Sequence, residues 1–530
     1  MDVTAAGFEL KVGVPGLSGA AAHALAADVV RRHLPGEWRL EVSLLDDRLF
    51  EVRPVGPPPT VADSWDLARA MAADRDVVYA EPLLETPGLS PDTPAEAAAR
   101  AATERGSGGA TATEPDANWH IAHCGIDAAW ALSRGDGVVI GHPDTGYLQH
   151  SEIWKDGPVN RVLSDFGFNF VEPEGRDALS PRSTHGTATA SVIMSDGDAT
   201  DGKIHVSGVA PRARLIPIRV DNDVLHFSWG RVRKAVDWAV RRDCHVISMS
   251  LGGPITGPSL RESIQRAVER GTIVVAAAGN IWPFVAYPGR YQEVLCVAAS
   301  NERRQKWGDS ARGEDVDVTA PGEFVWRATV ENGVNTVLPS SGTSYATAIV
   351  AGIAALWLAR HERQRLIERY GAPNIAAVFK EIVMKHGVDK PPGWDTKRMG
   401  AGIINAKKVL EAPLPATVPA RGVTSVRTAT APPVQTDFDD IAHYFPDVPR
   451  ERVRANLVDL LGTTDAALDA ELARLGEELK LHAAINPQMR ARRSGAPAEA
   501  VDRGGGVAVT RDAIESQLML SSGLRARMAG

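Results

Sequence analysis

The stretch that decides the fold is GVVIGHPDTG, residues 137–146. It joins a short aliphatic run directly to a carboxylate, Asp144. An apolar run without alternation is typical of a strand that is covered on both faces of a parallel sheet. The stretch therefore predicts a buried strand with the carboxylate of Asp144 at its carboxyl end.

Apolar runs of the same kind recur along the chain, at residues 214–219, 245–249 and 273–277. Amphipathic helical patterns lie between them, at residues 230–241 and 259–269. Strands that alternate with helices predict an α/β domain, with a parallel sheet and helices on both faces. We assign this domain residues 118–412.

The chain has 530 residues, which is too long for one hydrophobic core and predicts several folded units. Its 58 basic and 66 acidic side chains leave a formal net charge of −8, which gives no electrostatic reason to bind nucleic acid. We find no apolar run of the roughly 20 residues that a membrane-spanning helix needs, so we expect no membrane association.

Two stretches rich in small residues and proline, 85–117 and 413–436, read as linkers because they show no apolar periodicity. Residues 1–84 before the first linker have the element order βαββαβ, with the last strand at residues 76–80, which predicts a ferredoxin-like α+β domain. Residues 437–486 after the second linker predict a small all-α module of three helices, at residues 438–445, 449–461 and 464–475. Residues 487–530 predict a flexible tail in which a terminal helix is an option.

Three cysteines occur in the whole chain, Cys124, Cys244 and Cys296. An odd and sparse set cannot build a disulfide framework, so we expect buried, inert thiols. The first residues lack the basic and apolar segments of a secretory signal. We therefore expect a cytoplasmic protein, and the Ala- and Arg-rich composition suggests a high-GC bacterial source.

Three short motifs carry candidate chemistry: DTG at residues 144–146, HGT at 185–187 and GTS at 342–344. Taken singly, each is a common strand end, turn or helix cap. DTG also marks aspartic proteases, but those enzymes need two such carboxylates and no second DTG or DSG occurs in this chain.

Combined, the motifs supply the parts of a nucleophilic hydrolase. Ser344 needs a base to become a nucleophile, and His185 can accept its proton. Asp144 can hold the imidazole in the correct tautomer. Asn280, which follows the strand 273–277, can donate a hydrogen bond to an oxyanion, together with the backbone N–H of Ser344 at a helix start.

We predict no catalytic metal. His120, His123 and Cys124 have metal-compatible spacing, but no second ligand pair follows. The acidic residues Asp196, Asp198 and Asp201 could hold structural calcium or form a solvated loop.

In order and context the motifs resemble the subtilisin-like serine protease family (subtilases, peptidase family S8). Three further segments are similar to that family: GVAP at residues 208–211, DVTAPG at 317–322 and GAGIINA at 400–406. The resemblance implies a subtilisin-like parallel sheet and serine endopeptidase activity on peptide or protein substrates. It implies no required cofactor, although many relatives use calcium. Ser250, Leu251 and Gly252 resemble the edge strand that pairs with the substrate backbone.

VVYAEP at residues 77–82 resembles the end of the inhibitory propeptides that precede subtilases. The resemblance implies that residues 1–84 act as an intramolecular inhibitor; the alternative is a permanent accessory domain. The residues Phe445 and Pro446 resemble ubiquitin-binding CUE and UBA modules, which implies a protein partner. The alternative is a generic three-helix unit.

Two functions from different classes follow from these features. The first is a serine endopeptidase that works through an Asp–His–Ser triad and an acyl-enzyme, and is regulated by its flanking domains. The second is a peptide-binding or scaffolding protein whose substrate site is occluded and which has no turnover.

Overall fold

The computed structural model describes most of the chain. The residues described are 3–13, 16–17, 19–85, 116–155, 157–172, 177–180, 183–197, 204–226, 229–280, 284–331, 333–418, 437–444, 449–485, 521–522, 524 and 526. The predicted linkers, the predicted tail with its terminal helix, and the Phe445-Pro446 pair lie largely or wholly outside this set.

The amino-terminal part is a four-stranded antiparallel sheet in the order β2-β3-β1-β4, with two helices. Its elements are β1 (Thr4–Val12), α1 (Gly19–His33), β2 (Trp38–Val42), β3 (Leu49–Pro54), α2 (Val61–Ala72) and β4 (Val77–Glu85). This is the predicted βαββαβ order, and β4 runs five residues beyond the predicted end at residue 80. Both helices pack their apolar sides on the sheet, because Val29 and Met71 are fully buried in the same cluster as Phe8 and Leu10.

The central part is a nine-stranded sheet in the order β14-β15-β11-β10-β9-β8-β5-β7-β6. All its pairings are parallel except that of β14 with β15, so the sheet is mixed where a parallel one was predicted. Its strands are β5 (Val139–Asp144), β6 (Phe168–Asn169), β7 (Arg214–Arg219), β8 (Val246–Met249), β9 (Ile273–Ala277), β10 (Leu295–Ser300), β11 (Val318–Pro321), β14 (Val388–Asp389) and β15 (Ile403–Ile404). A separate hairpin pairs β12 (Val325–Glu331) with β13 (Val334–Ser340).

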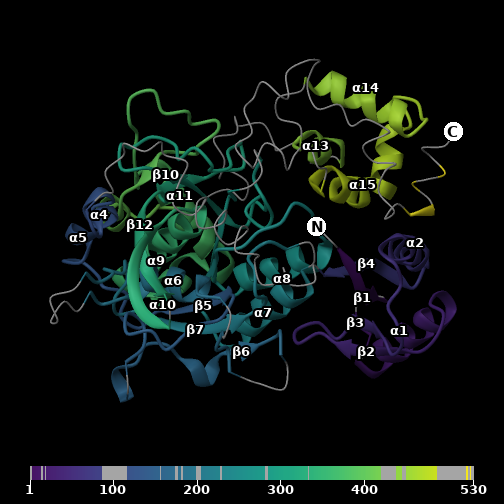
Figure 1. Ribbon diagram of the computed structural model, residues 1–530, viewed down its shortest axis with the longest axis horizontal. Coiled ribbons are helices and arrows are strands. Elements are labelled where there is room, and N and C mark those ends of the chain that lie inside the picture. The colour runs from purple at the N-terminus through teal and green to yellow at the C-terminus, as the bar shows by residue number, and fades with distance from the viewer. Residues whose placement is uncertain are drawn as a thin grey trace.

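Helices cover both faces of the central sheet, as predicted (Figure 1). The helices α7 (Gly230–Arg241) and α8 (Pro258–Glu269) pack on one face, and α6 (His185–Met194) and α9 (Thr343–His361) on the other. Smaller elements complete this part: α4 (Trp119–His123), α5 (Ile126–Ala129), α10 (Arg363–Tyr370), α11 (Ile375–Lys385), α12 (Ala406–Glu411) and the 3-10 turns Gly157–Val159, Ser164–Phe166 and Ala372–Asn374.

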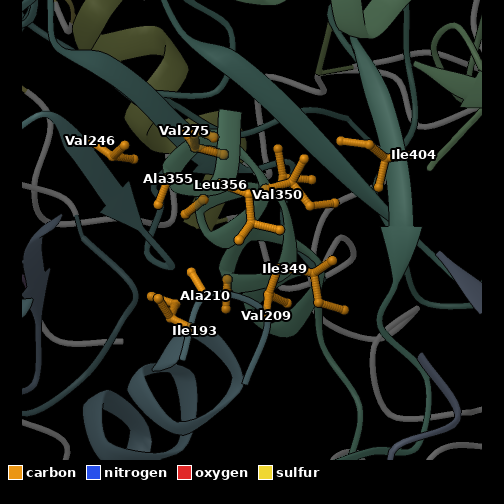
Figure 2. Close-up of a cluster of buried hydrophobic side chains, with 14 of the residues drawn as sticks. Ile193, Val209, Ala210, Val246, Val275, Ile349, Val350, Ala355, Leu356 and Ile404 are labelled. Atoms are coloured by element: carbon orange, nitrogen blue, oxygen red, sulfur yellow. The ribbon is translucent and has the colours of Figure 1, made fainter. Parts of the chain in front are cut away.

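Helix α9 forms the centre of the largest core cluster. Its side chains Ile349, Val350 and Leu356 lie between the sheet strands and the segment around Val209 (Figure 2). A methyl group at Gly352 would stand 2.6 Å from the Cβ of Val209, so only glycine lets the helix approach this closely. This helix is long and apolar enough to span a membrane by composition, but 89% of its apolar window is buried inside the protein, as expected of a core helix.

The carboxyl-terminal part contains three helices, α13 (Asp437–Ala442), α14 (Arg450–Leu460) and α15 (Leu468–Ile485). Three helices were predicted here. The third was predicted over residues 464–475, whereas α15 begins later and continues ten residues further. The extension follows from Leu479 and Leu481, which are buried in the same cluster as Leu472 and Leu475.

Cys124, Cys244 and Cys296 are free and fully buried, which confirms the expectation of unpaired interior thiols. Burial raises the pKa of each thiol. Their thiolate forms are therefore suppressed.

Candidate active site

Asp144 is the last residue of β5 and is only 1% exposed. Strand β5 pairs with β7 on one side, where Asp144 lies opposite Arg219, and with β8 on the other. The Thr145 backbone N–H donates to its Oδ1 over 2.7 Å. The sheet thus presents a carboxylate in a position that is fixed by the backbone of its own strand end.

His185 is the first residue of α6, and its Nδ1 lies 2.8 Å from Oδ1 of Asp144. The close approach depends on Gly186, where an added Cβ would stand 1.9 Å from the carbonyl oxygen of Gly146. The glycines of the two motifs therefore allow the start of α6 to contact the end of β5. This contact brings imidazole and carboxylate together.

Ser344 is the second residue of α9, and its Oγ lies 3.1 Å from Nε2 of His185. The same hydroxyl lies 3.3 Å from the carbonyl oxygen of Ser250, whose own Oγ donates to the carbonyl of Ser344 over 2.9 Å. Ser344 thus has two acceptors in reach. The start of α9 is held to Ser250, the residue after β8, by contacts in both directions.

The Asn280 side chain is oriented by a residue of the GTS motif. Its Oδ1 accepts from both the backbone N–H and the hydroxyl of Thr343, over 2.9 and 2.7 Å. With the oxygen engaged in this way, the amide Nδ2 is the atom directed at Gly342, where an added Cβ would stand 3.4 Å away. The amide N–H groups are therefore turned towards the region next to Ser344.

Two neighbours of Asp144 were missed by the sequence analysis. The hydroxyl of Thr189 donates to Oδ2 over 3.3 Å, and Nε2 of buried His142 lies 3.7 Å from the same oxygen. Burial alone would raise the pKa of Asp144, but His185, His142 and the Thr145 N–H hold it below its ordinary value. Thr189 lies one helical turn after His185, a spacing that places both on one face and could have identified it.

The segment Ser250, Leu251 and Gly252 resembles the edge strand that pairs with the substrate backbone. In the structure its N–H and C=O at Gly252 are already used: the N–H donates to the carbonyl of Val224 over 2.9 Å, and the C=O accepts from the N–H of His226 over 3.0 Å. A parallel bridge joins Leu225 to Gly252. The chain itself therefore occupies the hydrogen-bonding groups that a substrate strand would need at this position.

Within the described ranges, no group of three or more His, Cys, Asp or Glu side chains is arranged to hold a metal ion. Asp196 forms ion pairs with Lys155 and Arg161, whereas Asp198 and Asp201 lie outside the described residues. His120 and Cys124 are fully buried next to α5.

A model of the subtilase family matches residues 135–385. Thermitase of Thermoactinomyces vulgaris is 30% identical over 285 residues, which is 53% of this chain and 92% of thermitase. Subtilisin E of Bacillus subtilis (strain 168) is 36% identical over 200 residues, which is 37% of this chain and half of that protein.

Among solved structures, fervidolysin from Fervidobacterium pennivorans, a keratinolytic enzyme related to subtilisin, superimposes with a TM-score of 0.58. The match covers 78% of this chain and 62% of fervidolysin, at 21% sequence identity. At 21% identity, the similarity to fervidolysin shows that the two proteins share a fold.

Proposed function

We propose that this chain, which belongs to the subtilase family of serine endopeptidases, hydrolyses peptide bonds through Ser344, His185 and Asp144. The observation that carries the proposal is one continuous line of hydrogen-bonding distances, 2.8 Å from Asp144 to His185 and 3.1 Å from His185 to Ser344. Members of this family usually need no cofactor, and some bind structural calcium.

Each residue has a defined task in the proposed reaction. The Oγ of Ser344 attacks the scissile carbonyl carbon while Nε2 of His185 accepts its proton. Asp144, kept ionised by its partners, holds Nδ1 of His185 and stabilises the imidazolium. The oxyanion is held by Nδ2 of Asn280 and the backbone N–H of Ser344.

The proton on His185 then passes to the leaving amine, which leaves an ester on Ser344. Water attacks this acyl-enzyme with His185 as the base again, and the acid product departs. The cycle consumes one water per peptide bond and returns every catalytic group to its starting state.

Covalent labelling tests the assignment. A fluorophosphonate probe is expected to label the wild-type protein and to spare Ser344→Ala. Ser341→Ala is the matched control, because Ser341 precedes the motif and its Oγ accepts from the N–H of Phe324 over 3.0 Å. Equal labelling of wild type and Ser344→Ala would refute the nucleophile.

We further propose that residues 3–85 restrain the enzyme. This part packs on α7 and α8 through ion pairs that are largely buried: Glu9 with Arg233 at 2.5 Å, Lys11 with Glu262 at 2.6 Å and Glu51 with Lys234 at 2.8 Å. Glu9 also contacts the hydroxyl of Ser259. Charges that are removed from water on both sides favour a specific, lasting contact over a transient one.

The paired edge at Gly252 gives a specific reason to keep the second candidate, a peptide-binding or scaffolding protein without turnover. Peptide hydrolysis by the full chain, and by the chain from which residues 3–85 have been cut and then removed, distinguishes the two. Activity that rises when residues 3–85 are removed supports a latent protease. No hydrolysis in either form, together with no fluorophosphonate labelling, supports the scaffold.

For location we propose the cytoplasm. Three fully buried free thiols support this proposal, because reduced cysteines are typical of that compartment. Cell fractionation of the native host checks it, and recovery of the protein outside the cell would refute it.

A further inference from the structure

The carboxyl-terminal helices contact both other parts of the molecule. In Figure 1, α15 lies beside α2 of the amino-terminal part, and α13 lies on the side towards the central part. One apolar cluster contains residues from all three parts. They are Val3, Ala5, Val61, Trp65 and Leu84 from the amino-terminal part, Ile255, Phe284 and Ala286 from the central part, and residues of α13, α14 and α15.

We propose that helices α13–α15 form a clamp that holds the amino-terminal domain on the catalytic domain, so that residues 3–85 stay bound after the chain between them is cut. The partner of this module is thus the chain's own first domain. The proposal goes beyond the protease assignment, because it concerns retention and holds whether or not residues 3–85 inhibit.

The module contacts the catalytic domain through α13 and the turn that follows it. Asp440 lies 3.2 Å from the guanidinium of Arg290 and accepts from the hydroxyl of Tyr287 over 3.2 Å. The ring of Tyr444 packs on Phe284, with centroids 4.5 Å apart, and its hydroxyl donates to the carbonyl of Pro254. Arg290 is almost fully buried, so removal of its carboxylate partner would leave a buried charge less compensated.

The same module contacts the amino-terminal domain through α15, and Ser521 and Ser522 from a later segment of the chain add to this contact. Glu478 is fully buried and lies 2.9 Å from the guanidinium of Arg69 on α2. The backbone N–H and hydroxyl of Ser521 both donate to Glu478 over 2.7 Å, and the N–H of Ser522 donates to Asp66 of α2 over 2.7 Å. A buried carboxylate with an arginine partner from another domain is a strong and specific contact.

The contact of α13 with the catalytic domain and the contact of α15 with the amino-terminal domain are connected inside the module. Lys480, which is 1% exposed, donates to Asp440 over 2.9 Å and so ties α15 to α13. The module therefore bridges its two neighbours through helices that are joined to each other by this ion pair and by a shared apolar cluster. A bridge of this kind adds its own binding free energy to the direct contacts with α7 and α8, and two linked contacts dissociate far more slowly than either alone.

Carboxylates from the amino-terminal and carboxyl-terminal parts, Glu81 and Glu477, lie near each other where these two parts meet the catalytic domain. Glu81 of β4 is half-buried, and its Oε2 is shielded from solvent beside the start of α8, where an added Cβ at Gly257 would collide with the carboxyl. Burial and the nearby carboxylates raise the pKa of Glu81 above its ordinary value. The groups that face it are Glu9, Tyr79, Ser259, Tyr291 and Glu477.

A retention experiment tests the clamp on the full chain. A recognition site for a sequence-specific protease is inserted between residues 86 and 115, in the Ser344→Ala background so that the chain cannot cut itself. After cleavage, release of the amino-terminal fragment is followed by size-exclusion chromatography and by its dissociation rate. Because the protein is inactive, the result does not depend on the proposed catalysis.

The wild-type fragment is expected to stay bound. Arg69→Ala at one contact and Asp440→Asn at the other are each expected to speed release by about ten-fold or more. The first removes the arginine partner of buried Glu478, and the second removes one of the two carboxylates that pair with buried Arg290. Arg75→Ala is the control, because its side chain is 92% exposed on the same domain as Arg69. Circular dichroism of the uncut variants confirms that each has folded.

Two results would overturn the proposal. One is immediate loss of the wild-type fragment on cutting. The other is release from Asp440→Asn at the rate of the Arg75→Ala control, because a module that does not bridge cannot transmit a change on its catalytic side to the amino-terminal fragment.

Discussion

Replacement of Arg233 by alanine removes the most buried ion-pair centre between the amino-terminal and catalytic domains. Its side chain is 0% exposed and binds two carboxylates, Glu9 across the interface at 2.5 Å and Asp237 on the same helix at 3.1 Å. It also donates to the hydroxyl of Ser43 over 3.0 Å. After the substitution, Glu9 remains buried without this cation, whereas Asp237 keeps its ion pair with Arg266 at 3.1 Å.

The magnitude follows from this geometry. Breaking a buried ion pair by removing one partner costs about 3–5 kcal/mol. Glu9 and Asp237 share the guanidinium, so an equal division assigns about 2 kcal/mol to the contact across the interface, or roughly a 30-fold change in its dissociation constant. The rest falls on the stability of the catalytic domain, because Asp237 belongs to α7.

The assay is release of the amino-terminal fragment after cutting the linker, as in the clamp experiment. Arg233→Ala, Glu9→Gln and the double variant form a thermodynamic cycle whose coupling energy isolates the contact between the two side chains. Arg231→Ala is the matched control on the same helix. Its pair with Glu85 spans 3.4 Å between half-exposed side chains, so less than about a five-fold effect is expected.

Release of the fragment from Arg233→Ala no faster than from Arg231→Ala would refute the role of Arg233 at the interface. So would a coupling energy near zero, because the effect of Arg233→Ala would then come from the fold of α7.

Three further predictions concern the site and its control. Asp144→Asn is expected to lower kcat by about 10⁴ with little change in KM, because His185 loses the partner that fixes its tautomer; a loss of less than ten-fold in a peptide-hydrolysis assay would contradict this. Asn280→Ala is expected to lower kcat by about 10²–10³ while Ser344 still reacts with a fluorophosphonate, and an unchanged kcat would remove Asn280 from the oxyanion site. While the amino-terminal domain is bound, the pKa of Glu81 lies above its ordinary value of 4.5, so protonation of Glu81 stabilises the bound state. This contribution to the binding free energy is fully present below pH 4.5 and is lost as the pH rises through the raised pKa. Release of the amino-terminal fragment is therefore expected to speed up as pH rises, and Glu81→Gln to show a weaker pH dependence; identical pH profiles would refute this role.

Much of the catalytic fold could be predicted from local patterns. The strands β7, β8 and β9 lie within one residue of the apolar runs that predicted them, because a strand covered on both faces needs continuous aliphatic side chains. The two helices that begin at or beside the motif residues, α6 and α9, start where glycine, serine and threonine precede apolar stretches. Such signals extend over a few neighbouring residues and do not depend on the rest of the chain.

The surroundings of the site could not be predicted in the same way. Thr189 and His142 reach Asp144 only because α6 crosses the end of β5. The pairing of Gly252 with Val224 and His226 uses backbone groups, which carry no sequence signal.

The sequence by itself determined the family, the catalytic fold and the residues for which we propose catalytic roles, because these depend on short motifs and on the period of apolar residues. Only the tertiary structure decided how the three parts of the chain meet. Arg233 and Glu9 are 224 positions apart, and Arg69 and Glu478 are 409 apart. Whether such charges pair is decided by how the folded domains pack, and charged residues on a helix look alike in sequence whether they face solvent or another domain.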